Sequence, residues 1–62
     1  MIYRCYLLDD AARIVDRENF HAEEDRSARD RAREILFERR AYAAELWVFS
    51  RLVIRLTQEG SS

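Results

Sequence analysis

The sequence predicts a small α+β domain of order ββαββ, with one helix packed on a four-stranded, mainly antiparallel sheet. The run from Ile2 to Leu8 is rich in aromatic and β-branched residues, as strands are. The middle of the chain repeats apolar residues at helical spacing. The run from Ala44 to Leu56 has apolar residues at odd and even positions, so its strands would offer apolar groups to both faces of a sheet. Because a chain of 62 residues provides one helix at most, one sheet face is expected to stay uncovered.

The first two strands are expected to form a hairpin. After the strand from Ile2 to Leu8, the residues Asp9 to Ala12 supply a polar turn, without the glycine that tight turns prefer. The segment Arg13 to His21 returns as the second strand, with Ile14 and Phe20 as candidate core residues.

The helix is expected to begin around Asp25, whose carboxylate is a candidate N-cap for the amides of the first turn. One face carries the apolar residues Ala28, Ala32, Ile35 and Leu36. An acidic row flanked by arginines is expected to be a solvated face of the same helix. The helix is predicted to end near Arg40, although neither glycine nor proline marks its end.

The remaining chain is predicted to form a second hairpin that turns at Phe49-Ser50. A single domain of residues 1–57 would then be followed by a disordered tail, residues 58–62. If the helix instead continued, apolar residues from Ala28 to Leu56 would follow alternating steps of four and three, the seam of a long-helix coiled-coil dimer. The β-branched residues that concentrate after Glu45 favour the hairpin over this alternative.

Several short motifs are spread along almost the whole chain. The first strand contains Tyr3 and Tyr6, D-x-x-A spans Asp25 to Ala28, E-L-W spans Glu45 to Trp47, and R-L-V spans Arg51 to Val53. In these motifs the chain resembles a group of short uncharacterised proteobacterial proteins. The resemblance implies the same fold in a bacterial protein, and it implies no activity and no catalytic residues. Those proteins usually carry glycine at the first turn and after the helix, where this chain has none.

The residue types needed for catalysis are scarce. Cys5 is the only cysteine, so no intrachain disulfide can form; a buried apolar role and a reducing cytoplasm are expected for it. His21 lacks a partner motif, and Gly60 is the only glycine, so no glycine loop can cradle a phosphate. The acids Glu23 to Asp25 lack the spacing of a calcium loop. The first apolar run, interrupted by Arg4, is too short to span a membrane. The sequence therefore predicts no enzyme, no cofactor, no metal site and no membrane association.

The function predicted from the residues is interaction through the uncovered sheet face. If Leu46, Leu52 and Ile54 point to the helix, strict alternation places arginines and aromatic residues on the other side. The candidate interface residues are Tyr6, Trp47, Phe49, Arg51, Val53 and Arg55. Since aromatic residues and arginine are enriched in interface hot spots, a non-enzymatic module that forms a homodimer, or binds another protein, is expected.

Two alternatives remain open for this face. Arginines among aromatic residues are also the ingredients of single-stranded nucleic-acid binding. The net charge is −1 although all 11 basic residues are arginine, and no aromatic-rich nucleic-acid motif is present, so the protein interface is preferred. In the other alternative, Trp47 merely fills the core.

Overall fold

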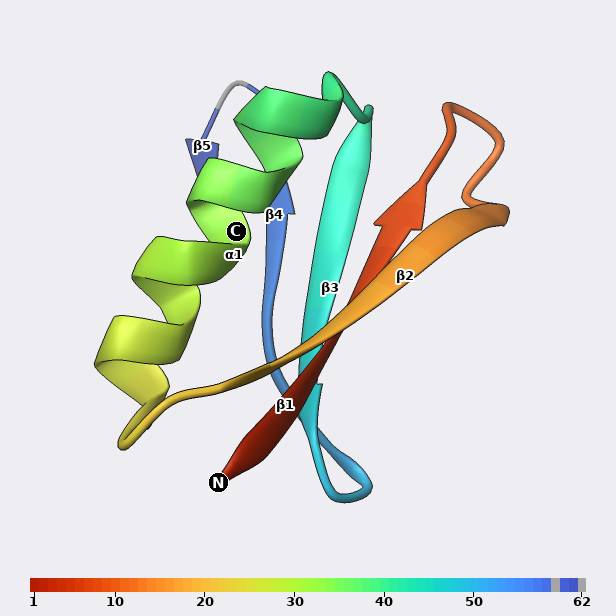
Figure 1. The fold of residues 1–62 in the computed structure, drawn as a ribbon. Coiled ribbons are helices and arrows are strands. Elements are labelled where there is room, and N and C mark those ends of the chain that lie inside the picture. Colours follow the sequence, from red (N-terminus) through yellow and green to blue (C-terminus); the bar gives the residue numbers. More distant parts are fainter. Residues whose placement is uncertain (59, 62) are drawn as a thin grey trace.

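One helix packs on one antiparallel sheet in this chain (Figure 1). The computed structural model describes residues 1–58, 60 and 61. The elements in chain order are β1 (Ile2–Leu8), β2 (Ile14–His21), α1 (Asp25–Arg39), β3 (Ala43–Val48), β4 (Arg51–Thr57) and β5 (Gly60–Ser61). The predicted α+β fold of order ββαββ is confirmed, and the long helix of the coiled-coil alternative does not form.

The sheet has the strand order β2-β1-β3-β4-β5, and every neighbouring pair is antiparallel. The second hairpin turns at Phe49-Ser50, as predicted. Of the predicted disordered tail, residues 59 and 62 lie outside the described residues. Within the described part of that tail, β5 pairs with Leu56 and Thr57, so the expectation of disorder is wrong at Gly60–Ser61.

The core lies between α1 and the sheet face that α1 covers. From the helix it takes the predicted apolar row, and from β1, β3 and β4 it takes Tyr3, Cys5, Leu7, Ala44, Leu46, Val48 and Leu56. Ile35 and Leu36 are fully buried, and burial of each such side chain contributes about 1.5–3 kcal/mol. The prediction that Cys5 is a buried apolar residue is confirmed.

The N-cap of the helix lies one residue before the predicted cap. Glu24 is the N-cap residue, with extended backbone and no side-chain cap hydrogen bond. Asp25 is the first helical residue, and its carboxylate accepts hydrogen bonds from the Tyr3 hydroxyl and from Arg51 instead of capping the first turn. The predicted N-cap role of Asp25 is therefore wrong, because side chains from two strands engage its oxygens.

The helix ends near Arg40, as predicted, and it does so without glycine. Arg40 adopts a left-handed conformation with φ of 54°. The Arg40 amide donates to the Phe37 carbonyl at 3.3 Å and the Ala41 amide donates to the Leu36 carbonyl at 3.2 Å, the pattern of a Schellman motif. The side-chain amide of Gln58 donates to the Leu36 and Ala41 carbonyls at 3.3 and 2.8 Å. The carbonyls at the end of the helix thus accept hydrogen bonds from the backbone that follows it and from the side chain of Gln58, the residue after β4.

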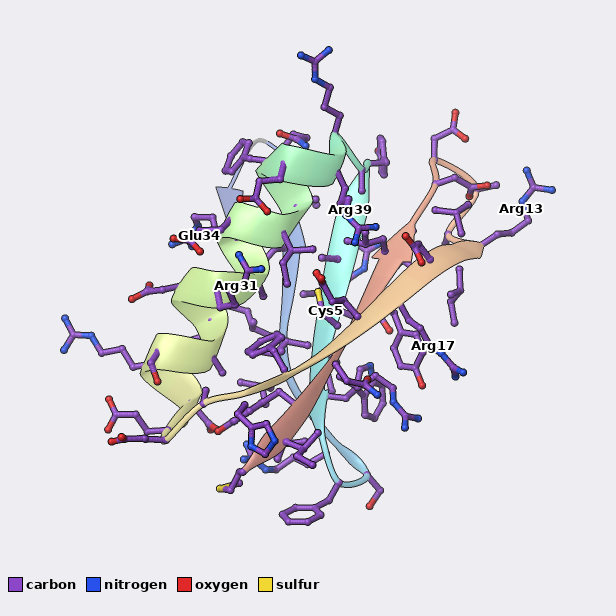
Figure 2. All side chains as sticks on the ribbon, in the orientation of Figure 1. Cys5, Arg13, Arg17, Arg31, Glu34 and Arg39 are labelled. Carbon is purple, nitrogen blue, oxygen red and sulfur yellow. The ribbon has the colours of Figure 1, made fainter. Side chains whose placement is uncertain are left out.

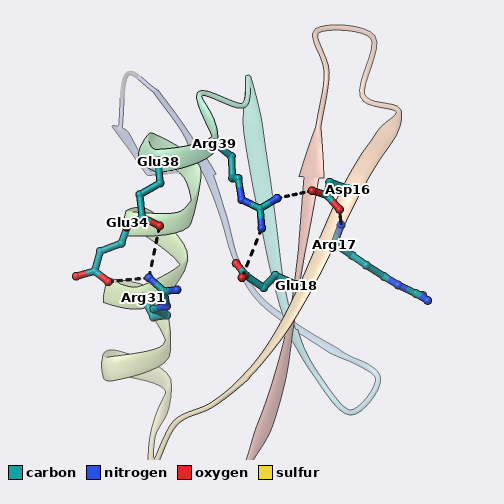
Figure 3. Close-up of polar contacts among 7 residues, drawn as sticks. All are labelled: Asp16, Arg17, Glu18, Arg31, Glu34, Glu38 and Arg39. Carbon is teal, nitrogen blue, oxygen red and sulfur yellow. Dashed lines mark hydrogen bonds and ion pairs between the residues drawn. The ribbon is translucent and has the colours of Figure 1, made fainter.

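Ion pairs join the helix to the edge strand β2 (Figure 3). Arg39, in the last turn of α1, pairs with Asp16 and with Glu18, the latter at 3.5 Å. On the outer helix face, Arg31 pairs with Glu34 at 3.1 Å and lies 3.7 Å from Glu38. The predicted solvated, ion-paired face is therefore present, and exposed pairs of this kind contribute little to stability because solvent screens them.

Candidate interface on the uncovered sheet face

The sheet face opposite α1 is assembled by the register of four strands. Cα partners in an antiparallel sheet place their side chains on the same face. Arg4 pairs with Asn19 on one side and Trp47 on the other, and Trp47 pairs with Leu52, so these four strands contribute to one row. The uncovered face, as defined by this register, comprises Ile2, Arg4, Tyr6, Leu8, Ile14, Arg17, Asn19, His21, Ala43, Glu45, Trp47, Leu52, Arg55 and Thr57.

A β-bulge in β4 changes which side chains reach this face. The register passes from Leu46 opposite Ile54 to Trp47 opposite Leu52, which leaves Val53 as the extra residue. Alternation is therefore interrupted, and Leu52 lies on the uncovered face with 45% of its surface exposed. The predicted orientation of Leu52 toward the helix is wrong.

The same bulge moves two predicted interface residues. Arg51 pairs with Val48 on the helix side, and its guanidinium donates to both carboxylate oxygens of Asp25, at 3.3 and 3.2 Å. Val53 is half-buried and packs against the core. The predicted far-side position is therefore wrong for Arg51, and Val53 contributes to the core. Tyr6, Trp47 and Arg55 do lie on the uncovered face, and Phe49 lies in the turn at its end.

Hydrogen bonds within and between strands orient the polar groups of the face. Arg4 donates from Nε to the Asn19 Oδ1 at 3.4 Å and from Nη1 to the Tyr6 hydroxyl at 3.2 Å. The Trp47 indole N–H donates to the Glu45 Oε1 at 3.2 Å, and Arg55 Nε lies 3.8 Å from the other oxygen of Glu45. The rings and the Arg4 guanidinium are thus held in place along the sheet.

Large apolar side chains remain exposed between these polar groups. Ile2 and Ile14 are each 59% exposed, and the ring of Trp47 is half-buried. Ile2, Trp47 and Leu52 gather at one end of the face, and an exposed apolar patch of this kind is typical of an interaction site. Within the described residues, the fold brings no element over this face (Figure 1).

The charge of the face differs in sign from that of the whole chain. The face holds Arg4, Arg17 and Arg55 against the single acid Glu45, a formal charge of +2, whereas the chain carries −1. Figure 2 shows Arg17 extending away from the helix side, where Arg39 lies. The helix side and the loops therefore carry the compensating negative charge.

A shallow hollow lies at the end of the face nearest the β3–β4 turn. Its volume is about 360 Å³, and it is lined by Ile2, Tyr3, Arg4, Asn19, Trp47 and Phe49. We call it the Trp47 hollow. It combines an indole, a phenyl ring and a guanidinium, all groups that stack with flat rings.

The single cysteine of the chain lies in the core, and a second hollow lies away from the Trp47 hollow. Burial, followed by the nearby Glu18 carboxylate, raises the pKa of the Cys5 thiol to about 11, so the thiolate nucleophile is scarce at neutral pH. The second hollow, of about 590 Å³, lies where the first turn meets the helix end, and two of its five charged lining residues, Asp16 and Arg39, are paired with each other.

The described residues hold no group of three or more His, Cys, Asp or Glu side chains placed to bind a metal ion. In that part of the chain, α1 is neither long nor apolar enough to cross a membrane.

Neither the bulge nor the role of Leu52 has a local sequence signal, because no glycine or proline marks the position. Comparisons with protein-family models, with curated proteins and with solved structures give no match for this chain.

Proposed function

We propose that this chain is a non-catalytic interaction module of the reducing cytoplasm that forms a homodimer through the uncovered face. The observation that carries the proposal is the exposure of Ile2 and Leu52 beside Trp47, with Ile14 exposed at the other end of the same face, which the single helix does not cover. Antiparallel sheets with one solvated face usually place polar residues on that face, whereas this sheet also carries Ile2, Trp47 and Leu52 there. A chain of this length also buries little surface alone, so dimer formation would stabilise it.

Sedimentation equilibrium tests the proposal with Leu52→Gln, which places a polar group in the apolar patch, beside Trp47, its Cα partner. We expect the dimer Kd to rise at least about tenfold, the loss expected when a hot-spot residue of an interface is made polar. Phe37→Gln is the matched control, since Phe37 is similarly exposed but lies on the outer helix side. A wild-type chain that stays monomeric at several hundred micromolar contradicts the proposal.

The charge of the uncovered face supports a second candidate, binding of single-stranded nucleic acid. Three arginines accompany Tyr6 and Trp47 on this face, a combination that would hold phosphates and stack bases. Arg17 makes no side-chain hydrogen bond or ion pair to the described residues, so it is the arginine best placed to meet a phosphate.

Fluorescence anisotropy with labelled oligonucleotides at several salt concentrations separates the two candidates. If the nucleic-acid candidate is right, log affinity falls linearly with log salt, and Arg17→Ala flattens the slope by roughly 0.7. Quenching of Trp47 fluorescence would report base stacking. Arg26→Ala, which removes an arginine from the helix, is the control. Absence of binding at micromolar protein in low salt removes this candidate.

A further inference from the structure

Phe49 occupies the first position of the two-residue turn between β3 and β4. Its side chain is 88% exposed, the highest value among the large apolar side chains of the described residues. Its φ is 54°, in the left-handed region, where a Cβ approaches the following carbonyl and glycine is favoured. A bulky apolar ring therefore occupies a position that is unfavourable for it in two respects, the left-handed backbone and the exposure to solvent. Strain of this kind, when the fold does not require the residue, points to a role in binding.

The turn lies beside the Trp47 hollow, which Phe49 borders. Arg4 lines the same hollow, and its guanidinium is held by Asn19 at 3.4 Å and Tyr6 at 3.2 Å. A planar guanidinium that is already oriented favours stacking with an aromatic ring, and the Trp47 indole offers a second such surface. The chemistry of the hollow thus suits an aromatic side chain.

We propose that Phe49 of one copy inserts into the Trp47 hollow of a second copy, and that the second copy does the same in return. This inference rests on the proposed self-association and specifies its contact. An interface with twofold symmetry needs a patch that complements itself, and a protruding ring next to a hollow that accepts rings meets this requirement. The two β3–β4 turns would then lie close to the twofold axis.

The size of the uncovered face favours a contact that reaches beyond the sheet. Four strands spaced about 4.8 Å apart and about 20 Å long have a flat footprint of roughly 400 Å². A standard interface buries about 800 Å² on each partner. A side chain that reaches beyond the sheet adds contact area, and a buried phenylalanine contributes roughly 150–250 Å². Insertion of Phe49 would bring the interface closer to the area that a stable dimer needs.

The test is Phe49→Gly, measured by sedimentation equilibrium and by urea unfolding of the dilute monomer. We expect the dimer Kd to rise at least about tenfold, as for a hot-spot residue. We expect the folding equilibrium constant of the monomer to rise about threefold, because glycine relieves the left-handed conformation. Phe49→Tyr keeps a ring and should retain the wild-type Kd. Ala12→Gly is the matched control: Ala12 is left-handed, with φ of 61°, in the other hairpin turn, so stability should rise without a change in Kd.

Failure of this inference and failure of the proposed function give different results. If Phe49→Gly dimerises with the wild-type Kd while Leu52→Gln weakens the dimer, the insertion is wrong and self-association stands. A monomeric wild type overturns both. If Phe49→Gly leaves the mass unchanged and weakens oligonucleotide binding instead, the ring binds bases and the insertion is also overturned.

Discussion

At the scale of single residues, Asp25 connects three elements through one carboxylate. Its Oδ1 accepts the Tyr3 hydroxyl of β1 at 2.8 Å, and Arg51 of β4 lies 3.2 Å from its Oδ2. The hydrogen bond from Tyr3 lowers the pKa of Asp25 below its ordinary 3.8, against the opposing effect of burial, and Arg51 lowers it further. Tyr3 is fully buried, so its hydroxyl depends on this carboxylate for a partner.

This lowered pKa predicts how stability responds to acid. The unfolded chain binds the Asp25 proton more tightly than the folded chain does, so the contribution of Asp25 is present above its unfolded pKa and is lost as pH falls through the lowered folded value. We expect Asp25→Asn to be less stable than wild type at neutral pH, with the difference shrinking from about pH 5 to about pH 2. Urea unfolding followed by circular dichroism at several pH values measures this. Asp30→Asn, on the solvated helix face, should follow the wild-type curve. A constant difference between Asp25→Asn and wild type across the range would contradict the assignment.

At the scale of elements, local composition predicts the strands and the helix well. Aromatic and β-branched residues mark β1 and β4, and the four-residue spacing of Ala28 and Ala32 marks the buried face of α1. The helix end near Arg40 follows from the change to strand-favouring residues. The left-handed conformation of Arg40 could not be predicted from the sequence, because glycine usually occupies this position and this chain has an arginine there.

The bulge in β4 could not be predicted for a specific physical reason. The segment from Arg51 to Leu56 is apolar on both faces, so a shift of one residue still buries a hydrophobic side chain and the pattern does not set the register. Contacts distant in sequence, such as Arg51 with Asp25, accompany the observed register. Alternation therefore predicted the correct face for Tyr6, Trp47 and Arg55. It failed for Arg51 and Leu52, the two residues of β4 that precede the bulged Val53.

At the scale of the whole molecule, charge and apolar surface are divided between the two sides of the sheet. One side is sealed by α1, with Arg39 pairing to β2, and the other presents Trp47 and Leu52 among arginines. In a face-to-face dimer, the arginines of the two copies would repel one another. We therefore expect the dimer Kd to fall as rising salt screens this repulsion. Nucleic-acid binding has the opposite salt dependence.

The proposed dimer makes stability depend on protein concentration, because association stabilises only the folded chain. Above the Kd, each tenfold rise in concentration should stabilise each chain by about 0.7 kcal/mol, half of the value that a factor of ten represents for the pair. For a domain of this size, the Tm should then rise by about 3–6 °C per tenfold step. Calorimetry or circular dichroism over a hundredfold range measures this, with Leu52→Gln as the control whose Tm should change much less. A wild-type Tm that is independent of concentration would mean that the monomer is stable with this face exposed to solvent. Self-association would then be rejected.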